Sequence, residues 1–382
     1  LGQYRPAPGV IDLAWGHPDP ALLDASLLAP ALAAALARHG PDALGYGAHL
    51  GPPPFRAWLR GHLATLDARA PADDELLVLP GASTGIELAF GMLAAPGDAV
   101  LVPAPTYHLA LRIAADHPVR IVPVPTDAAG ILPDAAAYAI RRIGATGGRA
   151  RFLYLVPVCA NPTGVTLPRE RRAALAALAA ETGVTILEDD VYRELTLDGP
   201  PPPSIWALAE PGSVLRLGSV SKTLAPAVRV GWMTGDGATI ARLAGSGLLD
   251  SGGGLQPLLA LAVAELGTSG AYAANLARIR AGLTERREAL VAALRAAVPG
   301  ATFHHPDGGY FLWLRLPAGV DPVAALPVAQ RHGVTWIPGA RFAGGTDAGD
   351  GAVRLAFSRN GPAELAEAAA RIGRAVAEVA AG

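Results

Sequence analysis

The stretch "GSVSKTLAPAVRVGW", residues 218–232, contains Lys222, the only lysine in the chain. The chain has 31 lysine and arginine residues in total, and the other 30 are arginines. An arginine keeps its proton at neutral pH and cannot serve as an amine nucleophile. A lysine that is partly removed from water has a lowered pKa and can attack a carbonyl group. The stretch therefore indicates Schiff-base chemistry at Lys222, with an ordinary surface lysine as the alternative.

A phosphate-binding P-loop is the other function that a "KT" pair after a strand and a glycine indicates. That motif needs glycine directly before the lysine, where this chain has Ser221. Pro226 also falls where the phosphate-binding helix should run. The sequence therefore favours an amine nucleophile over a nucleoside-triphosphate site.

The composition is that of a large globular protein with an aliphatic core. The 382 residues are 51% hydrophobic, and the formal net charge of -2 gives no broad attraction to nucleic acid or to anionic membranes. The single Cys159 excludes an internal disulfide, and the nine histidines show no metal-ligand spacing, so no metal is expected. Without a cationic leader or an 18-residue uncharged apolar run, we expect a soluble cytoplasmic protein without membrane or nucleic-acid partners.

Strands and helices alternate between about residues 76 and 240. Continuous apolar strands separated by helices predict an α/β fold with a mostly parallel sheet covered on both faces. Residues 75–83 contain a short apolar strand followed by a glycine turn, and residues 98–107 a strand that ends in a proline-rich loop. We expect further strands at 119–125, 151–158, 184–190 and 213–221. We expect helices at 24–39, 56–66, 84–95, 108–117, 133–143 and 168–182.

The rest of the chain predicts a second, smaller α+β unit. A long amphipathic helix at 273–298 precedes three short strands at 308–317, 333–339 and 352–358, and a closing helix at 362–380. We expect the arginines at 278–295 to form a solvated face. We assign residues 41–272 to the large domain, and residues 1–40 and 273–382 to the small domain.

Polar residues follow several of the predicted strands, at the rim where parallel sheets bind ligands. "EDDVY" places Asp189, Asp190 and Tyr192 after one strand, and "NPTG" places Asn161 after another. The acids could instead cap helices, and Asn-Pro could be an ordinary turn. "PGAST" is a glycine turn before a helix, where free N–H groups and the Ser83 hydroxyl suit a phosphate.

The order of these motifs resembles a known family. "NPTG" (161–164), "EDDVY" (188–192) and "SVSKTLAPAVRVGW" (219–232) follow one another at spacings of roughly 30 residues. The chain resembles pyridoxal 5′-phosphate (PLP) enzymes of the aspartate-aminotransferase fold, fold type I. It is most similar to the 2-aminoadipate/kynurenine aminotransferase group and to the aminotransferase-like half of MocR-type regulators, without their winged-helix segment.

The resemblance implies a role for each matching residue. Lys222 would bind PLP as a Schiff base and then shuttle protons as general base and acid. Asp189 would hold the pyridinium nitrogen, and it is preferred over Asp190 because it stands three residues before Tyr192, as in the family. Tyr192 and Asn161 would hydrogen-bond the ring hydroxyl.

The resemblance also implies the remaining contacts. Tyr107 would stack on the ring, and Arg354 would bind the substrate α-carboxylate with the Gly16 region closing over it. Tyr46 would reach the phosphate of the neighbouring subunit, which implies a homodimer. The phosphate cup would consist of Ala82 (through its N–H), Ser83, Ser219, Ser221 and Arg229.

The resemblance implies an aminotransferase that moves an amino group between an α-amino acid and a 2-oxo acid through Schiff-base and quinonoid intermediates. A PLP-dependent cyclase, or a β/γ-elimination or replacement enzyme, starts in the same way and is the alternative. A non-catalytic PLP-binding effector is the third reading. Ala160 stands where this family group often has a glutamine, and Trp15 and His17 flank Gly16. Because of these departures, the sequence does not identify the side chain of the substrate.

Overall fold

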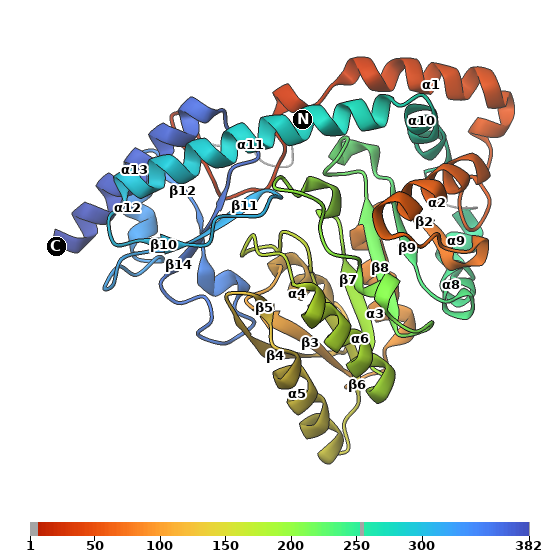
Figure 1. Ribbon diagram of the computed structural model, residues 1–382, viewed down its shortest axis with the longest axis horizontal. Coiled ribbons are helices and arrows are strands. Elements are labelled where there is room, and N and C mark those ends of the chain that lie inside the picture. Colours follow the sequence, from red (N-terminus) through yellow and green to blue (C-terminus); the bar gives the residue numbers. More distant parts are fainter. Residues whose placement is uncertain (1–6, 253–255, 382) are drawn as a thin grey trace.

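The computed structural model describes residues 7–252 and 256–381, and its centre is an eight-stranded sheet (Figure 1). The strand order is β2-β9-β8-β7-β6-β3-β4-β5. The strands β8, β7, β6, β3 and β4 pair with one another in parallel, whereas β2 with β9, β9 with β8, and β5 with β4 pair in antiparallel fashion. The predicted mostly parallel sheet is therefore present. Its strands are β2 (Leu76–Leu79), β3 (Ala99–Ala104), β4 (Arg120–Asp127), β5 (Gly130–Ile131), β6 (Ala150–Leu155), β7 (Thr185–Asp189), β8 (Val214–Ser219) and β9 (Gly231–Thr234).

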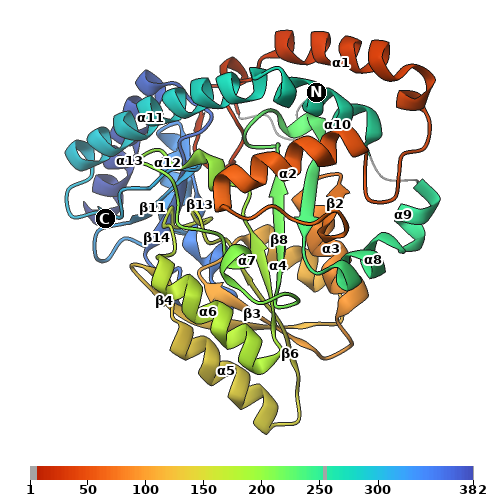
Figure 2. The same ribbon diagram turned by 45° about the vertical axis from the view of Figure 1, so that its right-hand side comes forward.

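Helices cover both faces of this sheet, because its strands are apolar on both sides. Leu153 and Ile186 point toward α5, α6 and α7, while Phe152 and Leu187 point toward α3 and α4. The figures show α5 and α6 side by side (Figures 1 and 2). These and the other helices near the sheet are α2 (Pro53–Asp67), α3 (Ala82–Leu93), α4 (His108–Ala115), α5 (Pro133–Ala145), α6 (Arg169–Thr182), α7 (Ile205–Leu208), α8 (Gly237–Ala244), α9 (Gly247–Gly252) and α10 (Pro257–Thr268).

A second, smaller sheet of order β10-β11-β14-β13 packs with the C-terminal helices. The long helix α11 (Ala271–Ala297) runs from the large sheet to this unit (Figure 1). The predicted strand at 333–339 is divided at Trp336, since β12 pairs with the N-terminal β1 and β13 pairs with β14. The remaining elements are β1 (Ile11–Asp12), α1 (Ala25–His39), β10 (Thr302–Phe303), β11 (Phe311–Arg315), α12 (Ala325–Arg331), β12 (Val334–Thr335), β13 (Ile337–Pro338), β14 (Ala352–Ala356) and α13 (Pro362–Ala381).

The expectation of a solvated arginine face on α11 is wrong for two of its residues. Arg286 and Arg287 are buried, at 7% and 3% exposure. Arg286 pairs with Asp19. Arg287 forms a bidentate pair with Asp198, in which Nη1 and Nη2 donate to the two carboxylate oxygens at 2.5 and 2.7 Å. These arginines therefore tie α11 to the N-terminal segment and to the loop after β7.

Membrane-spanning helices and metal-ligand clusters are both absent from the residues that the structure describes. No helix within 7–252 and 256–381 is long and apolar enough to cross a bilayer. The same residues contain no group of three or more His, Cys, Asp or Glu side chains arranged to hold a metal ion. His304 and His305 are paired instead with Asp307 and Glu288.

Candidate active site

A cavity of about 600 Å³ lies at the edge of the sheet where β6, β7 and β8 end. Ends of parallel strands meet at one edge, so residues that follow separate strands come together there. The cavity brings together all of the sequence-predicted site residues except Tyr46. Its wall includes Gly16, Ala82, Ser83, Tyr107, Asn161, Asp189, Tyr192, Ser219, Ser221, Lys222, Arg229 and Arg354.

Lys222 follows β8 and lies in the wall of this cavity. Its Nζ donates a hydrogen bond of 3.4 Å to the Gly16 carbonyl oxygen, and its ammonium lies 5.1 Å from the centre of the Tyr310 ring. Burial and the nearby Arg354 and Arg229 charges lower the pKa of Lys222 to about 8, although Asp189 opposes this shift. Far more of this amine than of an ordinary lysine is therefore unprotonated near neutral pH and able to attack a carbonyl.

The alternation of side chains along β7 separates Asp189 from its acidic neighbours. Asp189 lies on the same face as Leu187 and enters the cavity. Its Oδ2 accepts a hydrogen bond of 2.9 Å from the Tyr154 hydroxyl, and its Oδ1 is buried without a hydrogen-bond partner among the described residues. Burial raises the pKa of Asp189 to about 6. An unpartnered buried carboxylate oxygen needs a donor, so this atom marks a place for a ligand N–H.

Asp190 belongs to a buried ion network on the other face of the sheet. It contacts Arg216 at 2.9 Å and Arg193 at 3.7 Å, and Asp67 from the end of α2 pairs with both arginines. The side chains of these four residues are at most 3% exposed. Asp190 therefore has partners that hold it in the protein, which leaves Asp189 as the carboxylate of the cavity.

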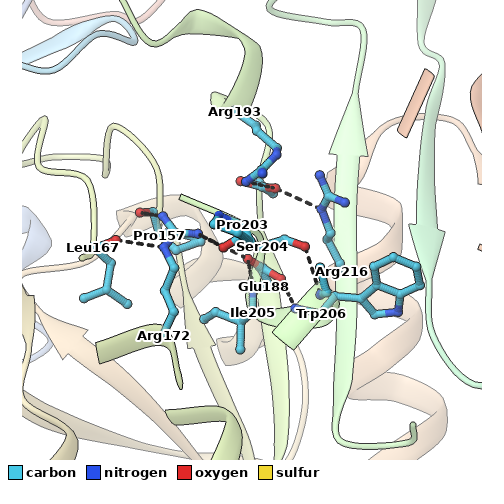
Figure 3. A network of polar contacts seen from close by, with 12 residues as sticks. Pro157, Leu167, Arg172, Glu188, Arg193, Pro203, Ser204, Ile205, Trp206 and Arg216 are labelled. Carbon is cyan, nitrogen blue, oxygen red and sulfur yellow. Dashed lines mark hydrogen bonds and ion pairs between the residues drawn. The ribbon is translucent and has the colours of Figure 1, made fainter. Parts of the chain in front are cut away.

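The network continues to Glu188, which lies on the same face as Asp190 because side chains alternate along a strand. Figure 3 shows Glu188 with its partners Ile205, Trp206 and Arg172. Glu188 accepts hydrogen bonds of 2.9 Å from the backbone N–H groups of Ile205 and Trp206, and it lies 3.8 Å from Arg172. Arg172 donates to the carbonyl oxygens of Leu167 and Pro157. The network thereby joins β7 and β8 to α2, α6 and the loop before α7, and it fixes the strand end that carries Asp189.

One end of the cavity is built to bind an anion. Helix α3 begins there at Ala82, and the first N–H groups of a helix lack partners within the helix. The Arg229 guanidinium lies alongside, donating to the Pro80 carbonyl oxygen at 2.8 Å and to Ser221 Oγ at 3.3 Å. Gly81 has a φ of 99°, and a Cβ there would overlap the Arg229 guanidinium. Glycine at this position therefore lets the cation approach the helix terminus.

The serines after β8 complete this end. Ser219 Oγ donates to Ser221 Oγ at 2.8 Å and accepts from the Ser221 N–H at 3.1 Å. Both hydroxyls border the cavity together with Ser83 from the first turn of α3. Three hydroxyls, a guanidinium and a helix N-terminus form a site that suits a phosphate group.

The cavity wall also contains the buried Arg354 from β14. Its Nη1 donates to Asn161 Oδ1 at 2.9 Å, and its Nη2 donates to the Ala14 carbonyl oxygen at 2.5 Å. Its Nε is buried without a hydrogen-bond partner among the described residues. Burial lowers the pKa of Arg354 to about 10, and the cation suits a carboxylate that enters the cavity.

Aromatic rings and an N-terminal segment close the cavity. Tyr107 and Tyr192 line it, and Gly16 lies so close to Phe311 that a Cβ on Gly16 would overlap the ring. Trp15 and His17, which flank Gly16 in the sequence, have stacked rings whose centroids are 6.0 Å apart. The segment that contains Gly16 therefore forms one wall of the cavity beside Lys222.

Tyr46 lies outside the cavity in a single chain. Its side chain is 87% exposed, and the nearby Leu44 is 71% exposed. A large exposed ring beside an exposed leucine is typical of a surface that another protein covers.

Sequence reasoning missed two residues of the cavity wall, Phe311 and His108, and one residue behind it, Tyr154. Tyr154 lies below Asp189, and Phe311 packs against Arg354 with its ring centre 4.1 Å from the guanidinium carbon. His108, at the start of α4, also lines the cavity, and burial beside Arg354 lowers its pKa to about 4. The alternation in "RFLYLV" could have placed Tyr154 on the face of Asp189, whereas nothing in the sequence links Phe311 to Arg354.

A second cavity of about 560 Å³ adjoins the first and shares Val156 and Asn161 with it. Its charged side chains already have partners: Asp127 pairs with Arg171 at 2.6 Å. The His304 ring lies 3.4 Å from Asp307. The Lys222 amine and the unpartnered Asp189 oxygen both belong to the first cavity.

The residues of the first cavity fit PLP. The unpartnered Asp189 oxygen suits a protonated ring nitrogen, the Lys222 amine suits the aldehyde, and the end beside Arg229 suits the phosphate. Together with the fold, this set of donors and acceptors defines a PLP-dependent transferase of fold type I.

Comparisons with known proteins identify the family. The family model for aminotransferase class I and II matches residues 9–372, so the chain belongs to this family. It is 30% identical to an aromatic-amino-acid aminotransferase of Thermococcus litoralis over 87% of this chain and 80% of the relative. It is 31% identical to a 2-aminoadipate transaminase of Thermus thermophilus over 97% of this chain and 90% of the relative.

A solved structure agrees with this assignment. Pyrococcus horikoshii kynurenine aminotransferase, crystallised with PMP, matches with a TM-score of 0.91 at 29% identity, covering 97% of this chain and 91% of that one. The expected fold type I architecture is confirmed. The protein is an aminotransferase, its cofactor is pyridoxal 5′-phosphate, and the alternative cyclase or elimination activity is not favoured.

Proposed function

We propose that this aminotransferase binds PLP through Lys222 and uses the cavity around it to exchange an amino group between an α-amino acid and a 2-oxo acid. The observation that carries the proposal is the position of two complementary groups in one cavity. The Lys222 amine has a lowered pKa, and a fully buried Asp189 oxygen is without a partner among the described residues. Amine and carboxylate are the two groups that PLP chemistry needs from the protein.

The other predicted residues would hold the cofactor in place. When bound, PLP supplies an aldehyde for the amine and a ring that withdraws electrons from the substrate. Asp189 would accept a hydrogen bond from the ring nitrogen, Tyr192 and Asn161 would bind the ring hydroxyl, and Tyr107 would stack on the ring. The phosphate would be bound by Ala82 (N–H), Ser83, Ser219, Ser221 and Arg229.

Lys222 would then move the protons of the reaction. Its Nζ would take the proton from the substrate Cα and return one to the cofactor carbon, as a base with a pKa near the working pH does efficiently. Arg354 would bind the substrate α-carboxylate, with the Gly16 segment as the adjacent wall. These contacts would fix the Cα–H bond toward Lys222, which favours proton transfer over other outcomes.

We further propose that the enzyme is a homodimer in which Tyr46 reaches the phosphate of the neighbouring active site. The exposure of Tyr46 and Leu44 supports this proposal. Residues 41–272 would form the large PLP-binding domain, and residues 1–40 and 273–382 the small domain. The pairing of β1 with β12 supports the assignment of the N-terminus, although α1 packs against α10 of the large domain. We also propose that the enzyme works in a reducing compartment such as the cytoplasm, which the single cysteine supports. We propose in addition that it has a biosynthetic role.

The test of the proposed reaction is a single half-reaction with purified enzyme. PLP-loaded enzyme is mixed with a panel of L-amino acids that includes phenylalanine, 2-aminoadipate and kynurenine, the substrates that the names of the relatives indicate. We expect the visible absorption to shift to that of pyridoxamine phosphate, with one equivalent of 2-oxo acid formed. Release of ammonia with unchanged cofactor absorption would contradict the proposal.

A further inference from the structure

Tyr154 and Asp189 are neighbours on adjacent parallel strands. Tyr154 of β6 is aligned with Leu187 of β7, and Asp189 follows two residues later on the same face. Both residues are buried, at 1% and 4% exposure. The Tyr154 hydroxyl donates a hydrogen bond of 2.9 Å to Asp189 Oδ2, while Asp189 Oδ1 stays unpartnered among the described residues.

The hydrogen bond from the Tyr154 hydroxyl to Asp189 Oδ2 affects the other carboxylate oxygen, Oδ1, in two ways. It restricts rotation of the carboxyl group, so that Oδ1 keeps one direction. It also stabilises the charged form of the carboxyl group, because a hydrogen bond to a carboxylate in a dry site is stronger than one to a neutral acid. Burial raises the pKa of Asp189 to about 6, and the Tyr154 hydrogen bond and the Lys222 charge oppose that shift.

The tyrosine is suited to remain a donor. Burial and the adjacent Asp189 charge raise the pKa of Tyr154 well above its ordinary value, so its hydroxyl keeps its proton at neutral pH. The ring packs in the main core with Phe152 and Leu187, which fixes the position of the hydroxyl.

We propose that Tyr154 is a positioning residue, whose hydroxyl holds Asp189 so that a charged Oδ1 meets the ring nitrogen of PLP. The inference rests on the proposed role of Asp189. In the sequence alone, Tyr154 in "RFLYLV" looks like an ordinary core residue of an apolar strand.

The test compares the affinity of the apoenzyme for PLP with its affinity for the PLP analogue that has a C–H group in place of the ring nitrogen. Tyr154→Phe removes the hydroxyl and keeps the ring in the core. We expect it to weaken PLP binding about tenfold, the effect of losing one hydrogen bond to a charged group. Binding of the analogue should change little, because the analogue has no ring N–H for Asp189.

Two controls make the result specific. Tyr272→Phe removes another buried hydroxyl, which bonds to Thr223 and Glu194, and it should leave the ratio of the two affinities at the wild-type value. Asp189→Asn should abolish the preference for PLP over the analogue. If Asp189→Asn keeps that preference, the proposed role of Asp189 is wrong. If Asp189→Asn loses the preference while Tyr154→Phe keeps the wild-type ratio, only the inference on Tyr154 is overturned.

Discussion

At the scale of single residues, the only lysine of the chain lies where the proposed reaction needs an amine that can lose its proton. Arginine suffices at position 229, where charge and hydrogen bonds are needed beside the helix terminus. Lys222 differs, because its surroundings lower its pKa and so disfavour its charged form. A buried ammonium near two arginines has a cost in stability, and this cost is typical of active sites.

Lys222→Met should therefore stabilise the folded apoenzyme. The pKa of Lys222 is about 8 in the fold, below its ordinary value of 10.5, so folding disfavours the ammonium fully at pH 7. We expect a gain of about 1–3 kcal/mol in the free energy of unfolding at pH 7, measured with denaturant. The gain should shrink as the pH rises from 8 to 10.5, since the unfolded chain then loses the same proton. A gain that is zero at pH 7, or independent of pH, would contradict the lowered pKa.

At this scale the period of a strand already separates the two neighbouring acids Asp189 and Asp190. The preference for Asp189 over Asp190 came from the family resemblance, yet the alternation along β7 explains it physically: Asp189 points into the cavity and Asp190 toward Arg216. Tyr154 was not predicted, because a tyrosine in an apolar strand is indistinguishable from a core residue without its partner. The roles of Lys222, Asp189 and Arg354 stay predictions, although the structure brings all three into one cavity.

At the scale of elements, apolar runs were sufficient to predict the parallel strands and the long helices. They did not predict β9, which has four residues and directly follows the Lys222 loop, and they did not predict the helices α8, α9, α10 and α12. Local patterns also cannot show the partners of charged groups. The expected solvated face of α11 is wrong because Asp19, which pairs with Arg286, lies 267 residues away, and Asp198, which pairs with Arg287, lies 89 residues away.

The buried ion network beneath the cavity should be essential for stability. Arg216→Met leaves Asp67 and Asp190 buried with fewer positive partners, and removal of one member of a buried ion pair typically costs about 3–5 kcal/mol. We expect a loss of this size in denaturant unfolding. The matched control is Arg38→Met, which removes an exposed arginine paired with Glu265 and should cost less than about 1 kcal/mol. Equal losses for the two variants would show that the network has no special role.

At the scale of the whole molecule, the cavity lies between the edge of the large sheet and the smaller unit that supplies Arg354. The proposed cofactor and substrate contacts would therefore come from both parts of the chain. The proposed dimer would add a third source, because Tyr46 lies outside the cavity of its own chain and is exposed.

Mixed dimers test whether Tyr46 acts across the interface. Tyr46→Ala and Lys222→Ala subunits should each have little activity as pure dimers. Co-expressed with different affinity tags, they should form hybrids in which one site has both residues, and total activity should recover to about a quarter of wild type by random pairing. Isolated hybrids without any recovered activity would contradict a shared active site.

The most direct test of the central claim, that PLP binds covalently to Lys222, is a peptide map of the reduced holoenzyme. The protein is treated with borohydride and digested with trypsin, which cleaves after arginine and unmodified lysine. Because Lys222 is the only lysine, we predict that the cofactor mass appears on the uncleaved peptide 217–229, and that the visible absorption band is lost on reduction. An unmodified peptide cleaved after Lys222, from protein that nevertheless holds PLP, would contradict the account.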